Sequence, residues 1–310
     1  MQLRDLGEFE LIDRIQRLAA GVQGRDVVLG IGDDAALLRP RRGEDLVVTS
    51  DAMVEGTHFR WDGETPRMLG RRALAANLSD LAAMGSRPIG FTFALAAPPS
   101  LEVRRVTGVV RGMLDLADSF ACPLVGGNVT RARETSINIT ALGAVAPGRV
   151  LMRSGARPGD RILVTGKLGI SALERARGRI RTVPTPRVAE GRALARIASV
   201  TACIDISDGL LADLEHLLEA SGVGGEIDAG RVPTPRGFET ACRRLRRDPF
   251  KLALGGGEDY ELLFTASGNT PSSKALERRL GTAVTEIGRI TVRGLQIHGA
   301  AGAPRGWRHF

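Results

Sequence analysis

The 310-residue chain has few aromatic residues, few cysteines and no long apolar segment. Aromatic side chains make up 4% of it, so it has few surfaces on which bases could stack, and its net charge of +8 does not by itself indicate a nucleic-acid partner. The three cysteines, Cys122, Cys203 and Cys242, form no CxxC pair, which disfavours a metal-thiolate site or a disulfide framework. No run approaches the roughly 18 apolar residues of a membrane span, and the amphipathic N-terminus lacks the apolar core of a signal peptide. We therefore expect a cytoplasmic protein with no membrane or nucleic-acid partner.

The common phosphate-binding motifs are also missing. There is no GxxxxGK[ST], because the pair Gly166-Lys167 is followed by Leu168 and lacks the upstream glycine. There is no GxGxxG of the dinucleotide or protein-kinase type, and the short segment 30–32 (Gly-Ile-Gly) does not replace it. If the chain binds phosphates, metal ions, backbone amides and arginine must hold them.

The length and the apolar periodicity predict a mixed α and β protein of two domains. A chain of this size is too long for one small core and suits two domains of roughly 150 residues. A stretch rich in turn formers, 146–160, predicts a boundary between domains 1–147 and 148–310. The pattern of apolar residues predicts helices over 8–20, 66–84 and 101–119 and strands over 46–49, 89–96, 136–145, 161–165, 202–205 and 260–265.

Acidic residues gather beside glycine or serine at the ends of these elements. The residues concerned are Asp33, Asp34, Asp51, Asp80, Asp205, Asp208, Glu258 and Asp259. Any one of them could be a turn former or a helix cap, and Asp208, before Gly209 and a leucine-rich helix, fits an N-cap. Their recurrence in five places favours a second interpretation, in which hard carboxylate oxygens on rigid turns bind Mg²⁺ together with phosphate oxygens.

Six motifs in the same order resemble the thiamine-monophosphate kinase family. They run from residue 30 to residue 262 and read GIGDDAALL at 30–38, TSD with EGTHF at 49–59, NLSDLAAMG at 77–85, RSGARPGD at 153–160, IDISDGL at 204–210 and GGEDYEL at 256–262. The wider superfamily includes aminoimidazole ribonucleotide synthetase, selenophosphate synthetase and a hydrogenase-maturation protein. Those enzymes share the handling of ATP, but not the combination of His58 with the GGEDYEL segment.

The resemblance implies both a fold and an activity. It implies an N-terminal α/β domain that binds ATP and Mg²⁺ and whose sheet closes a barrel in a homodimer, and a C-terminal α/β domain that completes the active site. The implied activity is ATP-dependent phosphorylation of thiamine monophosphate to thiamine diphosphate by direct in-line transfer, the last step of thiamine diphosphate biosynthesis. ATP would be the co-substrate and several Mg²⁺ ions the cofactors.

The resemblance also assigns roles by position. The implied metal ligands are Asp34, Thr49, Ser50, Asp51, Asp80, Asn128, Asp205 and Asp208. The implied ATP contacts are Gly127, Asn128, Arg153 and Ser207. The implied contacts to thiamine monophosphate are His58, Glu258 and Trp307, with Asp51 nearby. Asp51, Asp208 and Arg153 are the implied catalytic residues.

Two departures from the family pattern keep alternatives open. Where the family commonly has Gly-Gly-Asp, this chain has Asn128, which offers a carbonyl oxygen without a charge, and the segment 167–187 is short. The alternatives are another ATP-dependent member of the superfamily, of the ribonucleotide or selenophosphate synthetase type, or a nucleotide-binding protein without turnover. A selenophosphate synthetase typically needs a reactive cysteine near its N-terminus, and none precedes Cys122.

Overall fold

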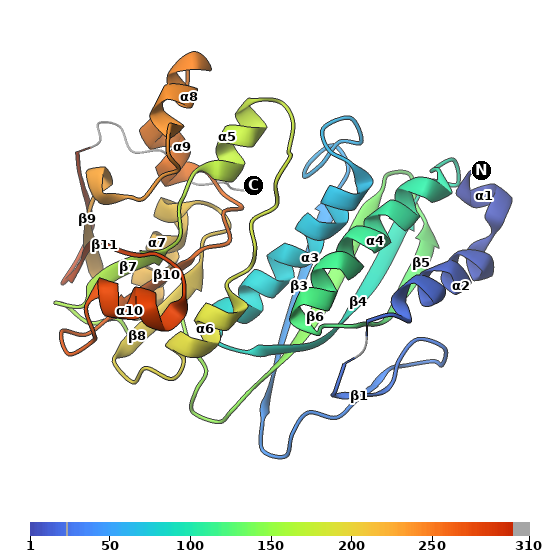
Figure 1. Ribbon diagram of the computed structural model, residues 1–310, viewed down its shortest axis with the longest axis horizontal. Coiled ribbons are helices and arrows are strands. Elements are labelled where there is room, and N and C mark those ends of the chain that lie inside the picture. The colour runs from blue at the N-terminus through green and yellow to red at the C-terminus, as the bar shows by residue number, and fades with distance from the viewer. Residues whose placement is uncertain (23, 300–310) are drawn as a thin grey trace. The chain divides into compact units, whose positions relative to one another are not determined.

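The computed structural model describes residues 1–22 and 24–299, which fold into two compact units (Figure 1). The first unit comprises Met1–Leu81, Arg87–Pro147 and Ile180–Val183. The second comprises Ala82–Ser86, Gly148–Arg179 and the described residues from Pro184 onward. Each unit has its own sheet and its own helices, so the chain is of the mixed α/β class that the sequence predicts.

The first unit is built on a four-stranded sheet in the order β3-β6-β4-β5. Strands β3, β6 and β4 are antiparallel neighbours, and β5 lies parallel to β4. A separate two-stranded ladder pairs β1 with β2. The strands of this unit are β1 (Val27–Leu29), β2 (Leu37–Leu38), β3 (Asp45–Val54), β4 (Arg87–Ala97), β5 (Leu124–Arg131) and β6 (Ser136–Val145). Its helices are α1 (Leu3–Leu6), α2 (Glu8–Ala19), α3 (Pro66–Ala83) and α4 (Val103–Phe120).

Helices α3 and α4 run side by side over this sheet (Figure 1). The buried residues of α4 recur at intervals of three and four, from Val103 through Val106 and Val110 to Met113, as expected for a helix with one apolar face. The two backbones meet at Gly70 of α3, where a Cβ atom would lie 1.9 Å from the carbonyl oxygen of Val109. Glycine is therefore required there, and it allows α3, which holds Asp80 and Arg72, to pack tightly.

The second unit contains a six-stranded sheet in the order β12-β9-β11-β7-β10-β8. All neighbouring strands are antiparallel except β12 and β9. The strands are β7 (Arg161–Thr165), β8 (Val200–Asp205), β9 (Gly224–Asp228), β10 (Leu262–Ala266), β11 (Val284–Thr291) and β12 (Leu295–His298). The α-helices are α5 (Ile170–Ala176), α6 (Val188–Leu194), α7 (Leu210–Ser221), α8 (Phe238–Arg244), α9 (Pro249–Gly255) and α10 (Ser273–Leu280), with a 3₁₀ turn at Ala229–Arg231.

Helix α7 packs its leucines into the core of this unit. Leu210, Leu214 and Leu217 are completely buried, together with Ile162 and Val164 of β7. This packing fixes where α7 begins, and the loop that connects β8 to α7 is the segment with the Asp205, Ser207 and Asp208 motif.

Most of the predicted elements are confirmed to within a few residues, including the long helices and the strand over 136–145. The strand predicted over 260–265 is wrong at its start, because β10 begins at Leu262. Tyr260 has a φ of 51°, in the left-handed region, which ends strand geometry before Leu262. Within the described ranges, no helix is long and apolar enough to cross a membrane.

Candidate active site

In the first unit, strand β3 and helix α3 bring two of the predicted metal ligands together. The hydroxyl of Thr49 donates a hydrogen bond to Asp80 Oδ2 at 2.5 Å. Side chains alternate along a strand, so Asp51 lies on the same face of β3 as Thr49. Ser50 is directed to the other face, where its hydroxyl donates to the carbonyl of Ile139 at 3.1 Å. The hydroxyls of Thr49 and Ser50 therefore do not point to the same place.

The predicted ligand Asp34 lies on an exposed loop, 30–34, of the same unit. Gln16 Nε2 of α2 donates to the carbonyl of Ile31 at 3.0 Å, and the Asp34 amide donates to Asp33 Oδ1 at 2.8 Å. These bonds hold the backbone of the loop, and the side chain of Asp34 is exposed.

Gly127 and Asn128, predicted to contact ATP, are consecutive residues of β5. They lie opposite Phe93 and Ala94 of the parallel strand β4, and both are exposed. A Cβ atom on Gly127 would lie 1.9 Å from the carbonyl oxygen of Phe93. The close approach of β4 is therefore sufficient to require glycine at this position, with or without a nucleotide.

His58 lies in a turn that follows β3. Its backbone amide donates to the carbonyl of Val54 at 2.8 Å, and the Val54 amide donates to His58 Nδ1 at 3.0 Å. The ring is half-buried and held by this second bond. A neutral imidazole that accepts at Nδ1 has its proton on Nε2, so the turn selects one tautomer.

In the second unit, the loop after β8 is organised by a residue that the sequence analysis did not single out. Asp213 Oδ2 accepts hydrogen bonds from the amides of Ser207, Asp208 and Gly209, at 3.0, 3.1 and 3.1 Å. The N-cap of α7 is Gly209, and no side chain caps it. The expected N-cap role of Asp208 is therefore wrong, and its carboxylate is not used to begin α7. The sequence did contain a signal for this role, since Asp213 is an acidic residue among the leucines of an apolar helix face.

The carboxylates around this loop interact strongly. Asp213 is 1% exposed, and burial, together with the negative charges of Asp205 and Asp208, raises the pKa of Asp213 to about 8. The backbone amides oppose this shift, but less strongly. A cation bound at Asp205 and Asp208 would relieve this repulsion. A cluster of negative charges is the electrostatic environment expected of a metal-binding loop.

Glu258, predicted to contact the substrate, is held next to the same loop. Its amide donates to the carbonyl of Ser207 at 2.7 Å, although about 50 residues separate them. Its carboxylate forms an ion pair with Arg175 of α5 at 2.7 Å. Glu258 has a φ of 63°, and this unfavourable conformation is typical of functional segments whose surroundings hold them in place.

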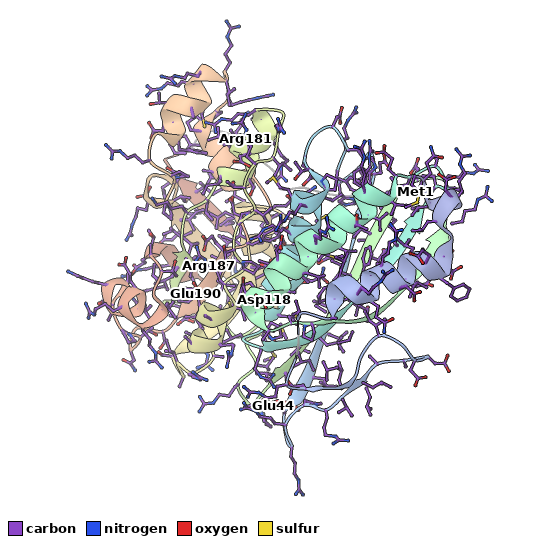
Figure 2. All side chains as sticks on the ribbon, turned by 45° about the vertical axis from the view of Figure 1, so that its right-hand side comes forward. Met1, Glu44, Asp118, Arg181, Arg187 and Glu190 are labelled. Carbon is purple, nitrogen blue, oxygen red and sulfur yellow. The ribbon has the colours of Figure 1, made fainter. Side chains whose placement is uncertain are left out.

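Glu261 anchors the segment that follows Glu258. Its carboxylate accepts from Arg187 Nε and Nη2 at 2.7 Å each, and from the hydroxyl of Thr165 at 2.7 Å. Arg187 also pairs with Glu190, and Figure 2 shows these two side by side at the start of α6. The hydrogen bond to Glu261 raises the pKa of Arg187 further above its usual value. This two-pronged bond fixes the end of the strained segment.

The remaining predicted residues are less informative. Arg153 is exposed, and its carbonyl accepts from the hydroxyl of Ser221 at 3.1 Å. Trp307 lies outside the described residues. A pocket of about 390 Å³ in the first unit is lined by Trp61, Glu102 and Arg105 among others, and none of the predicted site residues lines it. Two of its lining residues, Glu102 and Arg105, form an ion pair at 3.1 Å.

The donors among the described residues suit a hard cation, although these residues form no complete site of acids alone. Within residues 1–22 and 24–299, no group of three or more His, Cys, Asp or Glu side chains is arranged to hold a metal ion. The pair Thr49 and Asp80 and the acidic loop at Asp205 and Asp208 instead offer oxygen atoms of the kind that Mg²⁺ binds together with water and phosphate. These oxygen donors are compatible in chemistry with a hard cation such as Mg²⁺.

Comparison with known proteins extends the similarity through both units. Two family models match the chain. The N-terminal domain of the AIR synthase related proteins matches residues 32–145, and the C-terminal domain of the same proteins matches residues 157–299. The thiamine-monophosphate kinase of Mycobacterium tuberculosis is 36% identical over 320 residues, with 99% of this chain and 93% of that protein covered. The crystal structure of thiamine-monophosphate kinase from Stenotrophomonas maltophilia is 39% identical, covers 96% of this chain and 98% of its own, and has a TM-score of 0.81. A structure of AaThiL complexed with AMPPCP and TMP is 31% identical, covers 100% of this chain and 99% of its own, and has a TM-score of 0.75.

Proposed function

Because the chain belongs to the thiamine-monophosphate kinase family, we propose that it transfers the γ-phosphoryl group of ATP to the phosphate of thiamine monophosphate. An oxygen of the acceptor phosphate attacks the γ-phosphorus, and the bond from that phosphorus to the β–γ bridging oxygen breaks. The phosphoryl group is then bonded to the acceptor oxygen, and ADP leaves with the bridging oxygen. The full-length similarity supports this most strongly. The AaThiL complex, which holds the ATP analogue AMPPCP together with TMP, supports both ligands.

The acidic and hydroxyl residues would hold Mg²⁺. When bound, Mg²⁺ would neutralise charge on the phosphates and so favour transfer of the phosphoryl group. The proposed ligands are Asp34, Thr49, Ser50, Asp51, Asp80 and Asn128 in the first unit and Asp205 and Asp208 in the second. Thr49 and Asp80 are supported by their contact, and Asp208 is supported because α7 does not use it as a cap.

Backbone and side-chain atoms of the protein would position the nucleotide. Gly127 and Asn128 on β5, Ser207 on the Asp213-anchored loop, and Arg153 are the proposed ATP contacts. Arginine offers a planar fork of donors that matches a phosphate group. Among these and the acids, Asp51, Asp208 and Arg153 are proposed to act on the reacting phosphate. Charge stabilisation and in-line positioning are the main contributions expected of them.

No general base is required in this mechanism, because the acceptor phosphate is already an anion at neutral pH. His58, with its Nε2 proton fixed by the turn, would donate to that phosphate. Glu258 and Trp307 are the other proposed contacts to thiamine monophosphate. Glu258 is balanced by Arg175, so a cationic ring would approach a paired carboxylate.

Acceptor choice tests this assignment of His58. A site built to pair with a charged group rejects an analogue that lacks it by a large factor. We expect a much higher kcat/KM for thiamine monophosphate than for thiamine, and a fall for the monophosphate in His58→Ala. The matched control is His298→Ala, on exposed strand β12, which should behave as wild type. Equal use of thiamine, or a His58→Ala enzyme that matches the control, would contradict the account of acceptor choice.

The outer face of β3 supports a homodimer closed by the N-terminal sheets. Leu46 and Val48 are 56% and 61% exposed, and they alternate with Thr49 so that they lie on the face of the strand opposite to it. Exposed neighbouring apolar residues of this kind are typical of an interface. We expect Val48→Glu to lower the mass measured by light scattering, and an unchanged mass would count against this interface.

The assignment of roles to the two parts of the chain follows from the same proposal. Residues 1–147 would bind ATP and Mg²⁺ and dimerise, and residues 148–310 would complete the active site. The proposed location is the cytoplasm, where the odd number of separate, buried cysteines would stay reduced. Fractionation of the expressing cells would test this, and recovery in an extracytoplasmic fraction would contradict it.

A further inference from the structure

A buried ion pair lies against the turn that holds His58. Arg72 of α3 and Glu64, just before that helix, are 2% and 6% exposed. Arg72 Nε donates to Glu64 Oε2 at 3.3 Å, and a second, shorter bond joins Arg72 Nη2 to Glu64 Oε1. Charged groups are rarely buried to this extent unless they are paired, because removing them from water costs free energy.

A buried ion pair is by itself weak evidence for stability. Replacing a buried ion pair with apolar residues of similar volume is often neutral or stabilising. Arg72 also makes a contact that an apolar residue could not make, because its Nη2 donates to the backbone carbonyl of His58 at 3.0 Å. The guanidinium therefore connects the rigid helix α3 to the backbone of the residue proposed to meet the acceptor.

The position of that backbone determines the state of the imidazole. The turn is closed by the His58 amide on the Val54 carbonyl and by the Gly56 amide on the Phe59 carbonyl, at 2.8 and 2.9 Å. In this geometry the Val54 amide reaches His58 Nδ1. If the His58 carbonyl moved, the ring would lose this donor, and its proton could occupy either nitrogen.

We propose that Arg72, with its charge balanced by Glu64, is a positioning residue that keeps His58 in the tautomer with its proton on Nε2, ready to donate to the acceptor phosphate. The role of the phosphate rests on the proposed function, whereas the control of the tautomer does not. Arg72 acts through the backbone of His58 and touches no reacting atom in this account.

The test removes both charges of the ion pair together. The double variant Arg72→Met/Glu64→Met keeps the volume and deletes the bond to His58, and Arg72→Lys keeps the charge balance but not the fork of donors. The matched control is Arg60→Met/Asp62→Met, which removes an ion pair more than 70% exposed on the same loop. Nitrogen NMR of the imidazole reports the tautomer, and steady-state kinetics report KM for each substrate.

We expect the control to match wild type in both measurements. The Arg72/Glu64 double variant should remain folded by circular dichroism and show a mixture of His58 tautomers. Its KM for thiamine monophosphate should rise in inverse proportion to the fraction of rings with the proton on Nε2, about twofold for an even mixture. Its KM for ATP should be unchanged. Arg72→Lys should fall between the two. In a His58→Ala background, removing the pair should add little, because the ring that it positions is already gone.

Failure of this proposal differs from failure of the proposed function. If His58→Ala leaves KM for thiamine monophosphate unchanged, the role of His58 at the acceptor is wrong, and the NMR measurement alone decides the positioning role. A single Nε2 proton retained in both the double variant and Arg72→Lys would overturn the proposal. So would a KM effect of the double variant that is equally large with and without His58.

Discussion

The strongest structural prediction concerns Asp213, because one oxygen of its carboxylate, Oδ2, holds the loop that contains Ser207 and Asp208. Asp213→Ala removes three hydrogen bonds from backbone amides at 3.0–3.1 Å. At a net value of about 1 kcal/mol for each bond, the free energy of unfolding should fall by about 3 kcal/mol. For a unit of this size, that corresponds to a melting temperature lower by roughly 6–12 °C. Displacing Asp208 by about 1 Å should also lower kcat by roughly 100-fold.

Asp213→Asn provides the control, because all three amides converge on Oδ2 and an amide oxygen can take its place. We expect this variant to keep most of its stability and turnover, and Asp213→Ala to lose both. Thermal unfolding followed by circular dichroism in magnesium-free buffer, and ATP turnover with magnesium present, measure the two effects. An Asp213→Ala protein with the melting temperature and kcat of wild type would refute the reasoning. An Asn variant as damaged as the Ala variant would show that charge, and not an acceptor, holds the loop.

Three further predictions follow from the same geometry. Asp80→Ala and Asp208→Ala should keep the fold and lose most turnover, since their oxygens are proposed to bind metal. Asp80→Ala should lose about 1 kcal/mol of stability with the hydrogen bond from Thr49, and Asp208→Ala should lose less, because Asp208 does not cap α7. Near-normal rates in either variant would remove that residue from the site. Asn128→Asp should lower the Mg²⁺ concentration needed for half-maximal activity, because it adds a charge beside a dication; an unchanged requirement would place residue 128 outside the metal shell. Burial raises the pKa of Asp259 from its ordinary value of 3.8 to about 7. The folded state therefore binds this proton more tightly than the unfolded state does. The free energy of unfolding should fall as the pH rises from about 4 to about 7, by up to about 4 kcal/mol. Denaturant unfolding across this range should show a falling difference between wild type and Asp259→Asn, and a constant difference would contradict the assignment.

The periodicity of the sequence predicted the long elements because it reflects burial directly. Helix α4 and strand β6 are of this kind, and their apolar spacing of three to four and of two residues leaves little ambiguity. The order of strands in the two sheets was not predictable in this way. Pairing such as that of β10 between β7 and β8 depends on contacts between segments far apart in the chain.

The motifs gave a set of candidate site residues, but did not predict the local contacts that the structure shows for them. Strand alternation separates the hydroxyl of Ser50 from that of Thr49, although the two residues are adjacent. Asp208 fitted an N-cap by local pattern, and the buried Asp213 took over the amides that a cap would bind. Which side chain binds these amides depends on which one tertiary packing brings within reach, and a local sequence pattern contains no information on that.

The same limit applies to residues that act through others. Arg72 was part of an apolar helix pattern, and nothing in its spacing indicated that it reaches the carbonyl of His58. The ion pair between Glu258 and Arg175 joins a glycine-rich turn to a helix about 80 residues away. Charge compensation of this type can be recognised only when the fold has brought the partners together.

The central claim is transfer of the terminal phosphoryl group of ATP to an existing phosphate, and labelled ATP tests it most directly. The protein is incubated with Mg²⁺, thiamine monophosphate and ATP that carries ¹⁸O in its γ-phosphoryl group, and the products are separated and weighed by mass spectrometry. We expect thiamine diphosphate with the label in its terminal phosphate and an equal amount of ADP, with neither product formed when Mg²⁺ is chelated. ATP consumed without labelled thiamine diphosphate, or AMP formed in place of ADP, would contradict it.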